Sequence, residues 1–164
     1  MDGKDVRLAP MTAQMYHEYY REYRSDPDLC FDKGDFAEFA YDPEWVDRYV
    51  RRQADPGRRC FAILHGDEVV GELILKDIVP WERATLSISM KHGGYKDRGF
   101  GTRAERLAIE YAFGEMGVKV LHADAVLTNA RSRHVLEKVG FRETHEDGRF
   151  AYYEIKKEEW KERS

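Results

Sequence analysis

A short stretch near the middle of the chain, "YKDRGFGTRAER" at residues 95–106, constrains the fold more than any other part. Gly99 and Gly101 stand there among basic side chains, directly before a run of helical periodicity at residues 102–116. Glycines allow successive backbone N–H groups to curl around one anion, and a helix N-terminus offers unpaired N–H groups with partial positive charge. The stretch therefore predicts a phosphate-binding loop that opens a helix.

Two unrelated folds use such a loop, and one of them is the dinucleotide-binding Rossmann unit. "GFGTRA" fits its G-x-G-x-x-A fingerprint, and Asp124 lies 25 residues after Gly99, where that fold places an acid for a ribose hydroxyl. However, "KHGGYKD" separates Gly99 from the preceding strand, which ends at Met90, whereas Rossmann glycines follow their strand almost directly. The strands before the loop also form hairpins. The dinucleotide fold is therefore the weaker alternative.

Hydrophobic periodicity and turn residues place the other elements. Gly66-Asp67 and Asp147-Gly148 predict two hairpin turns, and Asp42 before Pro43 predicts the start of a helix. The element order predicts one mixed α/β domain over residues 1–164. Strands are expected at 6–10, 59–64, 69–78, 84–90, 118–126, 140–146 and 149–156, and helices at 11–24, 43–53, 102–116 and 129–139.

Composition excludes several classes of protein. The 164 residues carry a formal net charge of -4, which does not suit a nucleic-acid-binding protein. No run of 18 apolar residues occurs, so no membrane span is expected, and the first residues lack an apolar signal core. Cys30 and Cys60 are far apart and the six histidines are scattered, so we expect free thiols and no metal site. These features together favour a cytoplasmic protein.

Two motifs resemble a known family. "YKDRGFGTRA" resembles the pyrophosphate loop of the GNAT acyl-CoA N-acyltransferases, Gln/Arg-x-x-Gly-x-Gly/Ala, with Lys96 at the first position. "NARSRHVLEKVGF", at residues 129–141, resembles the second signature of that family, and 28 residues separate Gly101 from Asn129. The segment between them is similar to Rim-type ribosomal-protein and polyamine acetyltransferases. The resemblance covers residues 84–156, about half of the chain.

The resemblance implies a single GNAT-type α/β domain, with a mixed central sheet of six to seven strands flanked by helices. It implies an acceptor-side lobe at about residues 11–55 and a CoA-binding core at about residues 84–141, with acetyl-CoA as co-substrate and no metal. Asn129 is also a favoured helix N-cap, and the two roles are compatible. The residues implied to contact the cofactor are Ser89, Met90, Lys91, Lys96, Asp97, Arg98, Gly99, Phe100, Gly101, Thr102, Asn129 and Ser132.

The implied reaction is direct attack of a primary amine on the thioester of acetyl-CoA. The amine must lose a proton, and Asp124 matches the position of an acidic residue in Rim-type enzymes; His122 and Glu72 are the alternatives. Many relatives use a tyrosine to protonate the thiolate, but this chain has Leu136 at that position. The resemblance to Rim-type members implies Ser132 as the acid instead; the alternatives are that no residue protonates the thiolate, or that Tyr152 or Tyr153 does. The family supplies an oxyanion-binding N–H from the strand before the loop, here around Met90.

Eight acidic residues lie between Asp26 and Asp47, against the single Lys33. The resemblance places this region along the acceptor groove, so the acids could attract a cationic amine such as a protein N-terminus, a polyamine or an aminoglycoside. The alternative is that they are solvated loop acids and helix caps. A second class of function also stays open, namely a GNAT-fold module that binds acyl-CoA without catalysis. A homodimer is compatible with either function.

Overall fold

The structure is a computed structural model of the chain and describes residues 5–95 and 98–163. The strands are β1 (Val6–Pro10), β2 (Arg59–His65), β3 (Glu68–Val79), β4 (Arg83–Met90), β5 (Val120–Val126), β6 (Arg142–Glu146) and β7 (Phe150–Lys156). The helices are α1 (Ala13–Glu22), α2 (Pro43–Gln53), α3 (Phe100–Gly114), α4 (Ala130–Val139) and α5 (Lys157–Arg163). Short 3-10 turns form η2 (Pro27–Leu29), η3 (Lys33–Asp35) and η4 (Gly93–Tyr95).

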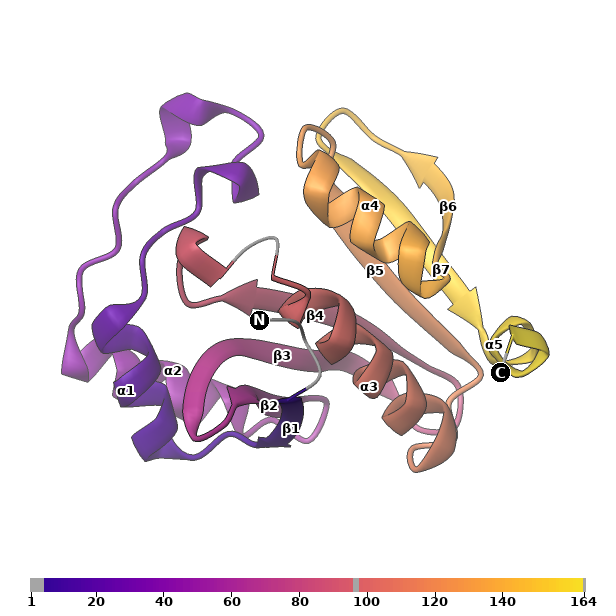
Figure 1. Ribbon diagram of the computed structural model, residues 1–164, viewed down its shortest axis with the longest axis horizontal. Coiled ribbons are helices and arrows are strands. Elements are labelled where there is room, and N and C mark those ends of the chain that lie inside the picture. The colour runs from indigo at the N-terminus through magenta and orange to yellow at the C-terminus, as the bar shows by residue number, and fades with distance from the viewer. Residues whose placement is uncertain (1–4, 96–97, 164) are drawn as a thin grey trace.

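A seven-stranded mixed sheet in the order β1-β2-β3-β4-β5-β7-β6 forms the centre of the molecule (Figure 1). Within the described residues, β4 and β5 are the parallel neighbours and every other pair is antiparallel. The predicted α/β domain and its number of strands are therefore confirmed. The Rossmann alternative is wrong, because that fold needs a series of parallel strands joined by helices.

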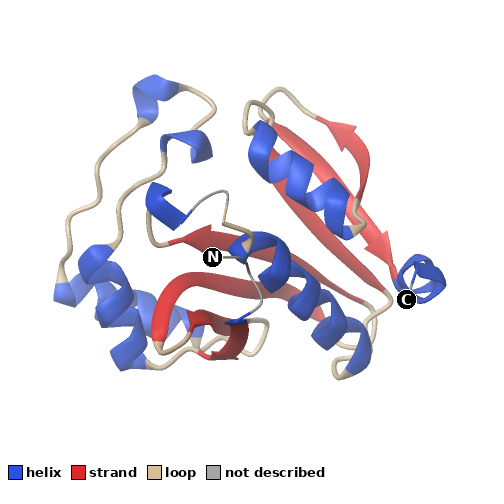
Figure 2. Ribbon diagram, in the orientation of Figure 1, coloured by secondary structure: helices blue, strands red, loops and turns tan. Residues whose placement is uncertain are grey.

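Helices cover both faces of the sheet (Figure 2). Ala62 and Leu64 on β2 face the cluster formed by α1 and α2, whereas Ile63 faces the cluster formed by α3 and α4. This follows from the strand period of two residues, which sends neighbouring side chains to opposite faces. The tyrosines of α1 pack in the first cluster, where Tyr16, Tyr19 and Tyr20 are buried.

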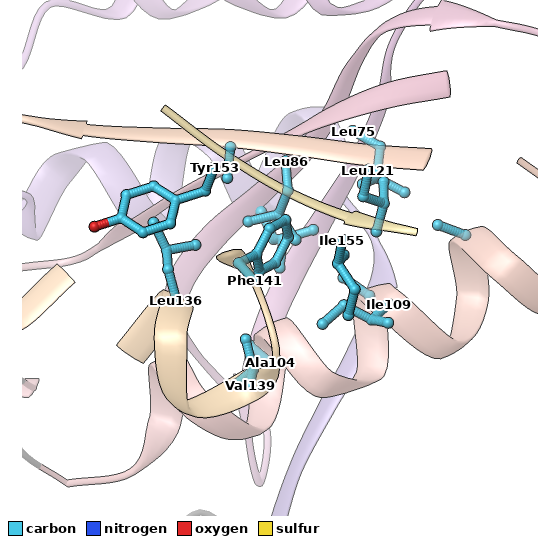
Figure 3. Close-up of a cluster of buried hydrophobic side chains, with 14 of the residues drawn as sticks. Leu75, Leu86, Ala104, Ile109, Leu121, Leu136, Val139, Phe141, Tyr153 and Ile155 are labelled. Atoms are coloured by element: carbon cyan, nitrogen blue, oxygen red, sulfur yellow. The ribbon is translucent and has the colours of Figure 1, made fainter. Parts of the chain in front are cut away.

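The larger core lies between the sheet and α3 and α4 (Figure 3). Ile109 and Phe113 of α3 and Phe141, which follows α4, are almost completely buried there. Each side chain of that size stabilises the fold by roughly 1.5–3 kcal/mol when it leaves water. This core holds α3 and α4 at fixed positions on the sheet. Figure 3 labels Leu75, Leu86, Ala104, Ile109, Leu121, Leu136, Val139, Phe141, Tyr153 and Ile155.

The boundaries of the predicted elements lie within two residues of those in the structure. The third long helix begins at Phe100, two residues earlier than predicted, because Gly99 adopts a left-handed conformation with φ 80° and acts as its N-cap. It also ends earlier, at Gly114, before a turn in which Gly117 has φ 68°. The short helix α5 was not predicted, since its sequence is mostly charged. Trp160 packs against Phe113 of α3.

Among the described residues, no helix is both long and apolar enough to cross a membrane.

Candidate active site

The parallel strands β4 and β5 separate after a short paired segment. The residues of β4 that pair with β5 are Arg83 to Thr85, whereas β4 continues to Met90 and β5 continues to Val126. Figure 1 shows the two strands diverging from the end near α5, with α3 and α4 beside the opening. The divergence opens the sheet at its centre, and the cavities of the site lie there.

Two adjoining cavities occupy this opening and share Leu29, Ile88, Glu105 and Ser132. We name them the Gly101 cavity and the Asp124 cavity. The Gly101 cavity is lined by Asp26, Leu29, Ile88, Ser89, Met90, His92, Gly101, Glu105, Asn129, Arg131, Ser132 and Val135. The Asp124 cavity is lined by Leu29, Lys76, Leu86, Ser87, Ile88, Glu105, Ala123, Asp124, Val126, Ser132, Leu136 and Phe150.

The glycine loop opens onto the first of these cavities. Gly99 is the N-cap of α3 and has no side chain, so this residue makes no side-chain hydrogen bond to the N–H groups of the first turn. Gly101 lines the cavity, and a Cβ atom built on it would meet nothing within 4 Å. Packing within the protein therefore does not require a glycine at position 101, but an approaching ligand would. The loop fits an anion held by backbone N–H groups at the start of α3.

The other residues of the glycine loop differ in burial and in the groups that they contact. The Phe100 side chain is fully buried, so any contact with a cofactor would come from its backbone. The Arg98 guanidinium lies 4.7 Å from the centre of the Phe100 ring and 5.6 Å from that of Tyr95. Thr102 is half-exposed in the first turn of α3. Lys96 and Asp97, which the sequence placed in the same loop, lie outside the described residues.

The end of β4 presents backbone groups to the opening. The Lys91 N–H donates to the carbonyl oxygen of Val70 on β3 at 2.8 Å, so the N–H of Lys91 faces β3. Backbone groups alternate in direction along a strand, which turns the N–H groups of Ile88 and Met90 towards β5. Both residues line the Gly101 cavity, as does Ser89, whose hydroxyl lies 3.0 Å from the Tyr19 hydroxyl. These N–H groups lie where the sequence predicted an oxyanion donor, and that role stays a prediction.

Lys91 itself does not line either cavity. Its side chain is buried, and its ammonium lies 3.1 Å from a Glu22 carboxylate oxygen and 3.2 Å from one of Glu68. A buried ammonium needs such partners, because removing a charge from water is costly. Glu68 also accepts a hydrogen bond from the Tyr95 hydroxyl. The Lys91 side chain therefore joins α1 to the sheet, and its predicted contact with the cofactor lacks the expected geometry.

Asn129 and Ser132 meet at the start of α4, as the second motif predicted. The Asn129 carboxamide oxygen accepts a hydrogen bond from the Ser132 N–H at 3.1 Å, which caps the helix. Asn129 is largely buried and lines the Gly101 cavity, while Ser132 lines both cavities. The capping role is therefore observed, and the same side chains are placed for a ligand.

The candidate bases separate clearly in space. Asp124 is exposed and lines the Asp124 cavity together with Ser132. It also lines a polar groove that contains His122, Lys76 and Tyr152. His122 lines that groove but not the two cavities. Of the bases that the sequence proposed, Asp124 is the one that the fold brings to the candidate acid.

Glu72 lies elsewhere, within the aromatic cluster of α1 and α2. Its carboxylate accepts hydrogen bonds from the Tyr20 hydroxyl at 3.1 Å and the Tyr49 hydroxyl at 2.9 Å. Burial raises the pKa of Glu72, and it also raises the pKa of both tyrosines. Glu72 lines neither cavity of the site. It anchors the two helices to β3 and is poorly placed to be the base.

Sequence reasoning missed Glu105, which lines both cavities from α3. Its side chain is 3% exposed, and its Oε1 atom has no hydrogen-bond partner among the described residues. A signal was present, because Glu105 stands on the helical stripe of Ala108, Ile109 and Ala112, where an apolar residue is expected. Leu29 of η2 also lines both cavities, and nothing local in the sequence indicates this.

Many of the acids in the predicted acceptor lobe serve local structure. Asp26, Asp32 and Asp42 each cap a helix or turn through a side-chain hydrogen bond. Asp28 lies 3.3 Å from Arg131 of α4, and Asp47 lies 2.8 Å from His17. The alternative interpretation as caps therefore applies to several of these residues. Among Asp26, Asp28, Asp32, Asp42 and Asp47, the residue that also lines the Gly101 cavity is Asp26.

Comparisons with known proteins agree with this architecture. The family model described as "Acetyltransferase (GNAT) domain" matches residues 5–142. The Campylobacter jejuni N-acetyltransferase PseH in complex with acetyl coenzyme A has a TM-score of 0.68 at 18% identity, covering 92% of this chain and 98% of that chain. The dodecameric spermidine N-acetyltransferase from Vibrio cholerae has a TM-score of 0.74 at 16% identity, covering 98% of each chain. No curated protein matches this sequence.

The matched domain spans most of the chain, and the chain belongs to the GNAT acetyltransferase family. At identities this low, the two solved structures show a shared fold. Membership of the family makes the protein an acetyl-CoA-dependent N-acetyltransferase. No group of three metal-ligating side chains is suitably placed among residues 5–95 and 98–163.

Proposed function

We propose that the protein transfers an acetyl group from acetyl-CoA to a cationic primary amine, with the reaction taking place between the ends of β4 and β5. The observation that carries this proposal is the meeting of three groups at one opening. These are the glycine loop at the start of α3, the Asn129–Ser132 cap of α4, and the end of β4 that is separated from β5. Each group belongs to a different element.

In this proposal the pyrophosphate of CoA lies against the N–H groups at residues 99–101, where the partial charge of α3 attracts it. The pantetheine arm extends along β4 beside Ser89 and Met90, and Asn129 contacts it from α4. The thioester then reaches the Asp124 cavity, which continues directly from the Gly101 cavity. The N–H groups of Ile88 and Met90 stabilise the oxygen that gains charge as the amine attacks.

Asp124 accepts the proton of the amine in this mechanism. An α-amino group with a pKa near 8 is about a tenth neutral at pH 7, whereas a lysine-like amine with a pKa near 10.4 is neutral about once in 2,500 molecules. A base therefore matters most for a polyamine-like acceptor. Asp124 stands where the Asp124 cavity meets the polar groove with His122 and Tyr152, so the acceptor approaches through that groove.

The test is release of CoA thiol from acetyl-CoA in the presence of amines. The panel contains polyamines, aminoglycosides, amino acids and peptides with free N-termini. Release that depends on one class of amine supports the proposal and names the acceptor class. A protein that binds acetyl-CoA but releases no thiol with any amine would instead be a non-catalytic binding module.

Gly101→Asp tests the position of the cofactor separately. The substitution adds bulk and negative charge where the pyrophosphate is expected, so acetyl-CoA binding should be lost in a folded variant. Gly114→Asp, near the far end of the same helix, is the control, because a Cβ atom there also meets nothing within 4 Å. Unchanged acetyl-CoA affinity of Gly101→Asp in calorimetry would contradict the proposed position.

A further inference from the structure

Glu105 has no role in the proposed mechanism, yet it borders both cavities of the site. It comes from the second turn of α3 and lines both the Gly101 cavity and the Asp124 cavity. Its side chain is almost fully buried, and its Oε1 atom has no hydrogen-bond partner in the described part of the chain. Buried polar atoms nearly always have a partner in folded proteins. A partner for this carboxyl group would therefore come from a molecule that enters the opening.

The surroundings of Glu105 favour its neutral form. Burial alone raises the pKa of this carboxyl group to about 8. The uncharged side chains of Ile88, Ser132 and Leu136 line the Asp124 cavity together with Glu105. At neutral pH Glu105 is therefore mostly a carboxylic acid, which can donate a hydrogen bond and a proton. The ionisable side chains that line the same two cavities are Asp26, Lys76, His92, Asp124 and Arg131.

A proton donor is needed at this point of the site. When the thioester breaks, the CoA sulfur leaves as a thiolate, and its protonation makes departure easier. Leu136 cannot donate a proton, and the Ser132 hydroxyl is a much weaker acid than the thiol that it would create. An acid catalyses most efficiently when its pKa lies near the operating pH, and it can protonate a thiolate, whose conjugate thiol has a pKa of about 8.5.

We propose that Glu105 is the catalytic acid that protonates the departing CoA thiolate, an inference that rests on the proposed acetyl transfer. The amine nitrogen forms a bond to the acyl carbon, and the carbon–sulfur bond breaks with its electron pair going to sulfur. The Glu105 proton passes to that sulfur and yields the CoA thiol. A cationic amine gives up two protons in all. One goes to Asp124 before the attack and then to solvent, and the other leaves the nitrogen after the attack and returns through solvent to Glu105, so no other reactant is needed.

Glu105→Gln is the first test, because it keeps the shape of the side chain and removes the transferable proton. We expect kcat to fall by about 10- to 100-fold, while the KM for acetyl-CoA stays within about twofold. The wild-type rate should decline above about pH 8 as Glu105 ionises, and this decline should be absent from the variant. Glu110→Gln, which changes an exposed glutamate of the same helix, should retain the wild-type profile.

Glu105→Leu separates a chemical role from a structural one. Leucine is apolar and suits the buried position, so the variant should be at least as stable as the wild type. It should nevertheless be as slow as Glu105→Gln, since neither side chain supplies a proton. A normal kcat in either variant would overturn the proposal. Weaker acetyl-CoA binding with an unchanged kcat would overturn it as well, and would make Glu105 a binding residue.

A second measurement needs no acceptor. Acetyl-CoA has no free thiol, so calorimetric titration at pH 8 in buffers of different ionisation enthalpy reports proton uptake by the protein. If bound acetyl-CoA buries Glu105 further, the wild type should take up as much as about half a proton per site at this carboxyl group. The Glu105→Gln variant lacks the carboxyl group and should not take up this proton. Equal uptake by both proteins would overturn contact between Glu105 and the cofactor. Unequal uptake without thiol release from any amine would instead contradict acetyl transfer, and the acid role with it.

Discussion

At the scale of single residues, the site depends on a few side chains whose surroundings change their chemistry. Glu105 and Asp124 illustrate the contrast, since both are carboxyl groups that line the Asp124 cavity. Glu105 is buried, and burial raises its pKa to about 8, whereas Asp124 is exposed on β5. Two carboxyl groups in such different environments can serve as proton donor and proton acceptor in one reaction.

The buried position of Glu105 predicts a specific dependence of stability on pH. Its pKa in the folded protein is raised above that of the unfolded chain, so its neutral form contributes stability that is fully present below about pH 4.5. That contribution is lost as pH rises towards 8, by on the order of 2 kcal/mol between pH 5 and 7. Glu105→Gln should remove this loss. Urea unfolding of both proteins at pH 5, 6, 7 and 8 measures it, and parallel pH dependences would contradict the prediction.

Asp124→Asn should slow the reaction most strongly at neutral pH. The variant cannot take the amine proton, so kcat should fall by about 10²- to 10⁴-fold at pH 7 and recover partly at high pH, where more of the amine is already neutral. Ser132→Ala should have a smaller effect. The measurement is a pH–rate profile with one good acceptor, together with acetyl-CoA affinity. A wild-type profile for Asp124→Asn would direct attention to His122 in the adjoining groove.

At the scale of elements, the helix ends of α3 and α4 and the end of β4 form the site together. Gly99 ends the loop in a left-handed conformation that most residues avoid, which directs the first turn of α3 towards the opening. Asn129 and Gly140 cap the two ends of α4, so its length and position are defined locally. Phe100, Phe113 and Phe141 then fix both helices on the sheet through the shared core.

Asn129 has two proposed functions that substitutions can separate. Asn129→Ala removes the cap of α4 and should cost about 1 kcal/mol of stability, while acetyl-CoA affinity should also fall. Asn129→Ser keeps a capping oxygen, so stability should be close to that of the wild type. If Asn129 contacts the cofactor, the serine variant should still bind acetyl-CoA more weakly. Calorimetry and urea unfolding of both variants give the two quantities, and full affinity in Asn129→Ser would limit this residue to capping.

At the scale of the whole molecule, the segment between α1 and α2 reaches the opening between β4 and β5. The α1 and α2 lobe brings η2 to the cleft, where Leu29 lines both cavities and Asp28 pairs with Arg131 of α4. Lys91 joins the same lobe to the sheet through Glu22 and Glu68. A carboxylate that caps a helix still adds to the electrostatic field around it, so the acidic residues of this lobe affect the field in front of the site.

This charge distribution predicts that a cationic acceptor reacts more slowly at high salt. Exposed charges are screened over about 8 to 10 Å at 0.1–0.15 M salt, so kcat/KM should fall as salt increases from low concentration. A neutral amine of similar size should show little change and is the matched control. Equal salt dependence for both acceptors would indicate that the acidic lobe does not attract the substrate.

Local patterns in the sequence were sufficient for the order of the main elements and for the two cofactor motifs. Glycines, caps and apolar periodicity act over a few residues, so "GFGTRA" predicted the start of α3 to within two residues and "NARSRHVLEKVGF" predicted α4. The same information placed Ser132 and Asp124 among the candidates. The charged segment of α5 carried little apolar pattern, and its helix was therefore missed.

Contacts between distant segments decided the rest. The sequence does not reveal that β4 and β5 separate after Thr85, that Lys91 turns to Glu22 and Glu68, or that Leu29 reaches the cleft. Glu105 is the clearest case, because burial by the whole fold raises its pKa and leaves its Oε1 atom without a partner. Desolvation depends on every atom packed around a group, and those atoms come together only when the chain has folded.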